Sequence, residues 1–170
     1  MTHERQAQMY RAAQSITTFN RWTFQAAKWL IYAIAALMLF EVVSRYSFNS
    51  PTSWGPELAT LLFGPFFLLG GPYLLHLRGH VAVDIVSANA RGRLKVILAL
   101  SAVLLAMLFG LILLWFSVPL AWQSYQYGET SYSAWNPPVW PAKMVLPIAA
   151  LLLVLQSVAE IVFIRTGEDI

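Results

Sequence analysis

Three side chains that can bind a metal or move a proton lie close together in the segment HLRGHVAVDIV. His76, His80 and Asp84 are four residues apart, a spacing that would place all three on one face of a helix. Two imidazoles and a carboxylate on one face could hold a metal ion and activate water. Gly79 interrupts that helix, however, and the other histidine, His3, lies near the N-terminus. We therefore interpret the segment as a polar elbow between two buried helices, and we expect no metal, haem or other cofactor.

The composition indicates the medium in which such an elbow would lie. Hydrophobic residues make up 58% of the 170 residues and charged residues only 11%, whereas soluble domains carry about 25% charged residues. The charges gather in clusters and leave long uncharged runs, each about long enough to cross a hydrocarbon core of about 30 Å as a helix. The sequence therefore predicts an all-α integral membrane protein. Because the chain has no cysteine, disulfides, iron–sulfur clusters and thiol nucleophiles are excluded.

The uncharged runs predict four transmembrane helices, at residues 29–46, 58–75, 96–122 and 144–164. The preceding residues 1–28 are polar but carry apolar side chains at three- and four-residue spacing, which predicts an amphipathic helix lying in the headgroup region. Prolines in the second span, Pro65 and Pro72, predict a bent helix that packs against protein, because the freed carbonyl groups need partners. Residues 165–170 form a short tail.

The distribution of basic residues predicts the orientation, because cytoplasmic loops are rich in Lys and Arg. Nine basic residues flank the spans on one side: Arg5, Arg11, Arg21, Lys28, Arg78, Arg91, Arg93, Lys95 and Arg165. The other side holds two, Arg45 and Lys143. Both termini are therefore predicted to be cytoplasmic. The basic run that includes Arg91 and Arg93 is explained by this rule and by anionic lipid, without nucleic acid.

Four further charged residues lie near the ends of the predicted spans. Glu41 and Arg45 are one helical turn apart, and Glu57 begins the next span at the same membrane edge. We interpret these three as a structural triad that holds helix ends together or pairs with another subunit. Glu160, in the last turns of the fourth span, is either a snorkelling interfacial acid or a cross-helix contact. No nucleophile has a base within plausible reach, so the sequence does not indicate an enzyme.

Two sequence elements resemble a known transporter family. The element PTSWGPEL (residues 51–58) follows the first span, and RGHVAVD, from Arg78 through His80 to Asp84, follows the bent second span. Together with the tryptophan-bearing third span they resemble the small permease subunit (DctQ-like) of TRAP transporters, the tripartite ATP-independent periplasmic transporters. The resemblance runs from about Phe40 to Gln156. The segment WNPPVWPAKMVLPI is similar to branches of the family that handle organic acids.

The resemblance implies a four-helix subunit of the bacterial inner membrane with both ends cytoplasmic. It implies two protein partners besides membrane lipids: a large permease subunit that carries the sodium and substrate sites, and a periplasmic substrate-binding protein. The expected function is then that of a fixed scaffold in a sodium-driven importer of an organic acid. Two alternatives stay open, a stand-alone proton-coupled four-helix transporter and the membrane anchor of a respiratory enzyme.

The aromatic, proline-rich loop before the fourth span is the expected docking surface for the binding protein. Tyr127, Glu129, Tyr132 and Trp135 are its candidate residues, because Tyr and Trp bury a large area with few rotatable bonds. Prolines stiffen this loop, so less entropy is lost on docking. The alternative interpretation is an ordinary aromatic belt at the membrane surface.

Overall fold

The computed structural model describes residues 3–77 and 93–166, and the described part folds into four long helices. These helices are α1 (His3–Ser47), α2 (Gly55–His76), α4 (Arg93–Gln126) and α5 (Trp140–Thr166). Each is long and apolar enough to cross a membrane. The four predicted spans all lie within these helices, and the helices extend beyond the spans at nearly every end. A helix can continue through polar residues outside the hydrocarbon layer. The length of an uncharged run is therefore the minimum length of the helix that contains it.

The helix α1 is a single element of 45 residues. The sequence predicted a separate amphipathic helix before the first span, but no break divides the two segments. The physical reason is that residues 3–47 contain neither glycine nor proline, the two residues that interrupt helices most strongly. At 1.5 Å per residue, α1 is about 67 Å long, about twice the thickness of a hydrocarbon core. The headgroup position of its N-terminal part stays a prediction.

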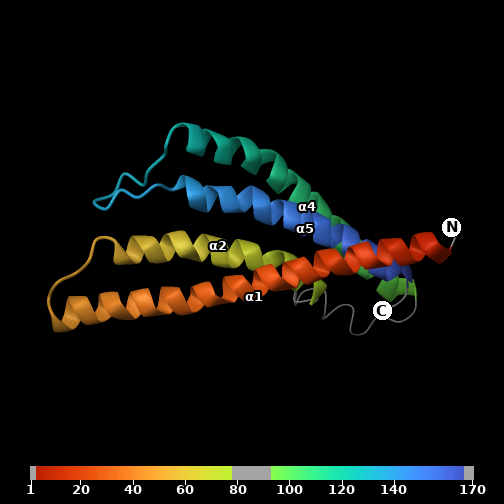
Figure 1. Cartoon of the computed structure of the whole chain (residues 1–170), viewed down its shortest axis with the longest axis horizontal. Helices are drawn as coiled ribbons and strands as arrows, with labels where there is room; N and C mark the ends of the chain where they lie inside the picture. Colours follow the sequence, from red (N-terminus) through yellow and green to blue (C-terminus); the bar gives the residue numbers. More distant parts are fainter. Residues whose placement is uncertain (1–2, 78–92, 167–170) are drawn as a thin grey trace.

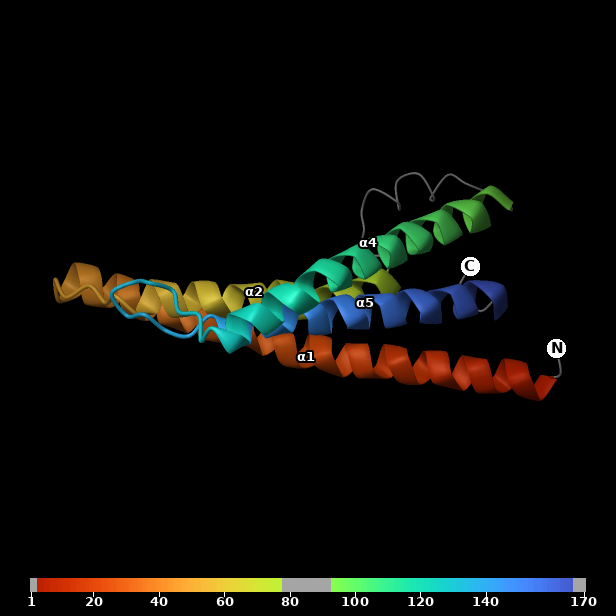
Figure 2. The same cartoon turned by 90° about the horizontal axis from the view of Figure 1, so that it is seen from above.

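The helices lie side by side in an elongated array with α5 at its centre (Figure 1). Helix α5 packs against α1, α2 and α4, whereas α4 packs mainly against α5. Two connecting loops are described, residues 48–54 and 127–139, and they lie at the same end, which we call the loop end (Figure 1). Toward the opposite end α1, α5 and α4 diverge (Figure 2). Each loop therefore brings two antiparallel helices together at the loop end.

Small residues allow α4 and α5 to approach closely. The buried positions of α4 include Gly110, Ser117 and Ser124, which recur every seven residues and share one face of the helix. A Cβ atom on Gly110 would lie 2.9 Å from a methyl group of Val154 and 3.5 Å from the carbonyl oxygen of Ala150. Close contact through small residues is typical of helix pairs in membranes.

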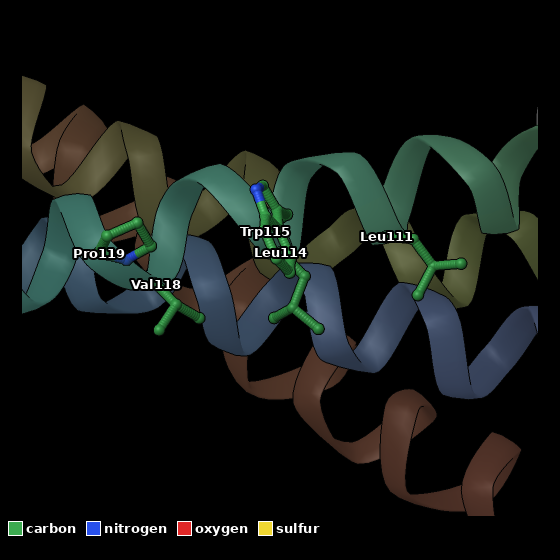
Figure 3. Close-up of a pocket in the computed structure, with 5 residues that line it drawn as sticks. All are labelled: Leu111, Leu114, Trp115, Val118 and Pro119. Atoms are coloured by element: carbon green, nitrogen blue, oxygen red, sulfur yellow. The ribbon is translucent and has the colours of Figure 1, made fainter.

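The outward face of α4 is apolar along most of its length. Exposed leucine, isoleucine, phenylalanine and tryptophan side chains cover it, and the apolar groove in Figure 3 lies on it. The groove is lined by Leu111, Leu114, Trp115, Val118 and Pro119. No charged residue lines it, so the groove offers a surface for packing and no group for acid–base or metal chemistry.

Candidate functional site

A buried carboxylate joins the first two helices at the loop end. Glu41 of α1 is only 3% exposed. Its Oε1 accepts hydrogen bonds from the Arg45 guanidinium, with Arg45 Nε at 3.1 Å. Its Oε2 accepts hydrogen bonds from the Thr52 hydroxyl and from the Thr52 backbone N–H, the latter at 3.0 Å. A Cβ on the neighbouring Gly55 would lie 2.7 Å from Thr52 Oγ1, so the first residue of α2 has to be small. Oε2 therefore holds the turn between α1 and α2, while Oε1 pairs with Arg45 within α1.

No hydrogen bond or ion pair among the described residues joins Glu57 to this pair, although Glu57 too connects helix ends. The Ser133 hydroxyl donates a hydrogen bond of 2.6 Å to Glu57 Oε2 instead. The reason is helical rotation: Gly55 faces Glu41, and a side chain two residues later points about 200° away around the axis. Glu57 thereby connects the start of α2 to the loop between α4 and α5.

That loop, residues 127–139, folds back on itself in the manner of a hairpin. The backbone N–H of Val139 donates to the carbonyl oxygen of Glu129, and that of Ser131 donates to the carbonyl oxygen of Pro137, each at 3.0 Å. An isolated antiparallel bridge lies between these two hydrogen bonds. The loop therefore has a defined backbone conformation, and we call it the docking loop after the role expected for it from the sequence.

An ion pair fixes the base of the docking loop to α5. Lys143 Nζ donates to both carboxylate oxygens of Glu129, at 2.7 and 2.6 Å. Hydrogen bonding to the Lys143 ammonium holds the pKa of the Glu129 carboxyl below its ordinary value of 4.5. The sequence did not pair these two residues, which are 14 positions apart, because only closure of the loop brings them together.

Aromatic side chains project from the docking loop. Tyr127 and Tyr132 are 83% and 87% exposed, and Trp135 is 39% exposed. Tyr132 has a backbone φ of 54°, a left-handed conformation that is unusual for a bulky residue. Its N–H donates to Asn136 Oδ1 at 3.0 Å, which helps to hold this conformation. The fold thus maintains a strained backbone at a residue whose ring contacts almost nothing, a combination that is found at functional sites.

A second polar cluster, at the opposite end, crosses three helices. Asn20 of α1 donates a hydrogen bond of 2.8 Å to Gln156 Oε1 of α5, and both residues are buried. Gln156 Nε2 donates to Thr17 Oγ1 at 3.0 Å and to Glu160 Oε1 at 2.7 Å. The Gln156 amide therefore uses both of its N–H groups and its oxygen.

Glu160 extends this cluster to α2. His76 Nδ1 lies 2.7 Å from Glu160 Oε1, at hydrogen-bonding distance. The His76 ring also lies between aromatic rings, with centroids 5.9 Å from Tyr73 and 5.8 Å from Phe163. Of the two alternatives that the sequence left for Glu160, the structure has the cross-helix contact.

Comparison with protein families identifies what kind of membrane protein has this arrangement. Residues 34–166 match the family described as tripartite ATP-independent periplasmic transporters, DctQ component. The chain belongs to this family. The match begins inside α1 and ends at the last residue of α5, so it includes the docking loop and most of the polar cluster. A comparison with curated proteins found no match.

Membership of the DctQ component family makes this chain a small membrane subunit of a TRAP transporter, located in the inner membrane. The family also implies partnership with a large permease subunit and a substrate-binding protein. This favours the transporter subunit over the two alternatives, a proton-coupled four-helix transporter and a respiratory anchor. The predicted identity is confirmed.

The predicted site residues of this TRAP subunit fall into three groups. Those of the docking loop and the pair of Glu41 and Arg45 lie at the loop end. Glu160 lies in the polar cluster at the other end. The predicted elbow residues Arg78, His80 and Asp84 lie outside the described residues, so their interpretation stays a prediction.

Sequence reasoning missed Asn20 as a member of the polar cluster, although a signal was present. Ala13, Asn20 and Ala27 recur every seven residues, which places them on one helix face, and all three are buried. A polar residue between two small ones on such a face indicates a close helix contact with a hydrogen bond across it. Residues 13 and 20 precede the segment that matches the family, and both are buried. The packed structure therefore extends into the N-terminal half of α1, beyond the matched segment.

Proposed function

We propose that this chain is the fixed scaffold of a sodium-driven TRAP transporter that imports an organic acid. In this proposal the large permease subunit carries the sodium and substrate sites, and the chain described here supports it and presents the docking loop to the periplasmic binding protein. The proposal is supported by membership of the family and by the rigid connections at the loop end. Sodium coupling and the class of substrate rest on the family resemblance.

The proposal places both termini in the cytoplasm and the loop end in the periplasm. It is supported by the charge distribution, since the loop end holds Arg45 and Lys143 and the remaining basic residues of the described helices lie toward the other end. The test is accessibility labelling of single cysteines at Ser131 and Ser87 in intact cells. An impermeant reagent should label position 131 alone, and labelling of position 87 alone would reverse the topology.

Docking of the binding protein is assigned to the aromatic tip of the docking loop. The observation that carries this assignment is Tyr132, a ring that is 87% exposed on a backbone held in a left-handed conformation. A loop that is already ordered loses little entropy on docking, and an exposed tyrosine ring buries a large area in the contact. Tyr127 and Trp135 lie on the same loop and extend the proposed surface.

Glu129, which the sequence placed among the candidate docking residues, has a different proposed role. As a free surface charge it would set the rate of encounter with the binding protein. Its bidentate pairing with Lys143 neutralises that charge, so we assign it to holding the docking loop in place.

The experiment is uptake of an organic acid by vesicles that contain the complete membrane complex, as the binding-protein concentration is varied. Tyr132→Asn removes the ring while keeping a residue that tolerates a positive φ. It should raise the binding-protein concentration for half-maximal uptake about 5- to 30-fold, which corresponds to a loss of about 1–2 kcal/mol of binding free energy. The matched control is Trp122→Ala, an exposed aromatic residue within α4. An unchanged half-maximal concentration for Tyr132→Asn would leave the aromatic belt as the better interpretation.

The scaffold role predicts that this chain alone transports nothing. Vesicles that contain it without the large permease subunit should show no uptake of organic acids in a sodium gradient. Sodium-dependent uptake by the isolated chain would contradict the proposal.

A further inference from the structure

The N-terminal half of α1 carries basic residues without acidic neighbours. Between Glu4 and Glu41 the sequence contains no Asp or Glu, while Arg21 and Lys28 lie two turns apart. Both are exposed, and neither takes part in an ion pair within residues 3–77 and 93–166. Two cations are thus presented on one helix with no protein counter-charge among the described residues.

Large aromatic side chains accompany these cations. Trp22, Trp29 and Tyr32 are 68%, 66% and 65% exposed, and the rings of Trp29 and Tyr32 lie 5.4 Å apart. The buried side of the same helix, with Asn20 and Ala27, packs on the rest of the molecule. The aromatic rings and the cations therefore belong to the part of α1 that points away from the other described helices.

Contacts between α1 and α2 indicate how deep in the membrane these cations and aromatic rings lie. Phe40 stacks on Trp54 just before α2 begins, and Phe24 packs on Tyr73 near its end, with ring centroids 5.8 and 5.3 Å apart. Since α2 has 22 residues, it is about 33 Å long and matches the hydrocarbon core. Residue 24 therefore lies near one edge of that core, and the Cα of Lys28 lies about 6 Å inside it.

The direction of helical side chains brings the two cations to the same level. Side chains on a helix lean toward its N-terminus, and a lysine stem can lie along apolar surface while its ammonium reaches the headgroups. For Lys28 this direction leads out of the core and toward the level of Arg21. Closer to the centre of the membrane, Trp29 and Tyr32 lie where the glycerol backbone and the first part of an acyl chain of a lipid would run.

We propose that Arg21, Trp22, Lys28, Trp29 and Tyr32, here called the α1 anchor, bind an anionic phospholipid in the leaflet that contacts the N-terminal half of α1. The Arg21 and Lys28 cations hold the headgroup phosphate, and the aromatic rings contact the interfacial part of the lipid. The positive charge of Arg21 and Lys28 and their depth near the edge of the hydrocarbon core both favour an anionic lipid over an acidic protein segment. The proposal requires membrane insertion but does not depend on the docking role of the loop.

The test uses the full-length chain in lipid nanodiscs with acyl chains brominated near the headgroup. Quenching by brominated phosphatidylglycerol is compared with quenching by brominated phosphatidylcholine at equal mole fraction. The signal of the α1 anchor is the fluorescence that is lost from the protein when Trp22→Phe and Trp29→Phe are combined. Phosphatidylglycerol should quench this signal more strongly, and 1 M salt should reduce the preference because it screens exposed charges.

Matched variants separate a site from general attraction to anionic lipid. Arg21→Gln with Lys28→Gln should lower the relative affinity for phosphatidylglycerol about fivefold for each cation removed. The control combines Arg5→Gln with Arg11→Gln, which removes the same amount of charge nearer the N-terminus of α1. It should change the relative affinity for phosphatidylglycerol less than twofold.

Three results would overturn the proposal. The first is equal quenching by the two lipids in the unaltered protein, a measurement that needs no variant of the basic residues. The second is an equal loss of preference in the two charge variants. The third is loss of the quenching signal when the large permease subunit is assembled onto the chain, which would identify a protein as the occupant of this surface. Persistence of the lipid preference in the assembled complex would support the α1 anchor.

Discussion

The polar cluster around Gln156 gives the sharpest prediction about stability. Replacing Gln156 with Met keeps a similar volume in a buried site but removes hydrogen bonds to Asn20, Thr17 and Glu160. Interhelical hydrogen bonds in membrane proteins average about 0.6 kcal/mol, with a maximum of about 1.7, so the two bonds to α1 contribute about 1.2 kcal/mol. The third bond, to Glu160, lies within α5 and adds about 1 kcal/mol. The donors of Asn20 also lose their side-chain acceptor, which adds about 1 kcal/mol. We expect Gln156→Met to lower the free energy of unfolding by about 2–4 kcal/mol.

The assay is reversible unfolding of the purified chain in mixed micelles, followed by far-ultraviolet circular dichroism. A double-mutant cycle with Asn20→Leu measures the coupling between the two amides, which should be about 0.6–1.7 kcal/mol. Ser157→Ala is the matched control, because Ser157 is equally buried but, among the residues that the structure describes, its hydroxyl bonds within its own helix, to the carbonyl oxygen of Leu153. It should change stability by less than about 0.5 kcal/mol. A Gln156→Met protein as stable as the unaltered one, with no coupling to Asn20, would refute the inference that this cluster joins α1 to α5.

Three further predictions concern other contacts. Arg45→Ala should destabilise the chain by about 1–3 kcal/mol, which is less than the loss of a fully buried partner because Arg45 is half exposed. The yield of the complex with the large subunit should fall as the stability falls. A normal yield with lost transport would instead indicate that Arg45 acts directly in coupling transport to its driving force. The lowered pKa of Glu129 means that its ion pair stabilises the docking loop fully above pH 4.5, and that this stabilisation is lost as the pH falls from there through the lowered pKa. The protection factors of the loop amides, which correct for the intrinsic slowing of exchange in acid, should therefore fall below pH 4.5 in the unaltered protein, whereas in Glu129→Gln they should be low both above and below pH 4.5. Protection factors that do not change with pH in the unaltered protein would contradict this. Gly110→Leu should lower the free energy of unfolding by about 1–3 kcal/mol, because the new side chain pushes α4 away from α5. Gly64→Leu should lower it much less, because nothing lies within 4 Å of the Cβ position of Gly64. Equal unfolding midpoints for the two variants would contradict the close contact.

Hydrophobic length was sufficient to predict the four helices, and local signals could have predicted more. The boundaries of α2, Gly55–His76, lie within three residues of the predicted span 58–75 because a proline-rich turn and a polar segment flank it. The continuity of α1 was also readable, since its sequence lacks glycine and proline. The prediction of a separate helix gave weight to polarity, which governs where a helix lies in the membrane but does not interrupt it.

Contacts between helices could not be predicted in the same way. Glu160 meets His76 across 84 residues, and this depends on which faces of α2 and α5 are turned toward each other. The same limit explains Glu57, whose expected partner lay on the wrong side of the helix, and Lys143, which reaches Glu129 only when the loop closes. A single sequence gives the faces of each helix but not the pairing of faces between helices.

The placement of polar contacts has a mechanical consequence for the proposed scaffold. Directional hydrogen bonds join the helices at both ends, through Glu41 and Glu57 at the loop end and through Gln156 at the other. Close packing at small residues such as Gly110 joins α4 to α5 between them. Buried polar contacts in a low-dielectric medium resist rearrangement, because breaking one hydrogen bond leaves its partners unpaired. In the proposed scaffold, a subunit fixed at both ends in this way would hold the docking loop at a constant position relative to the membrane.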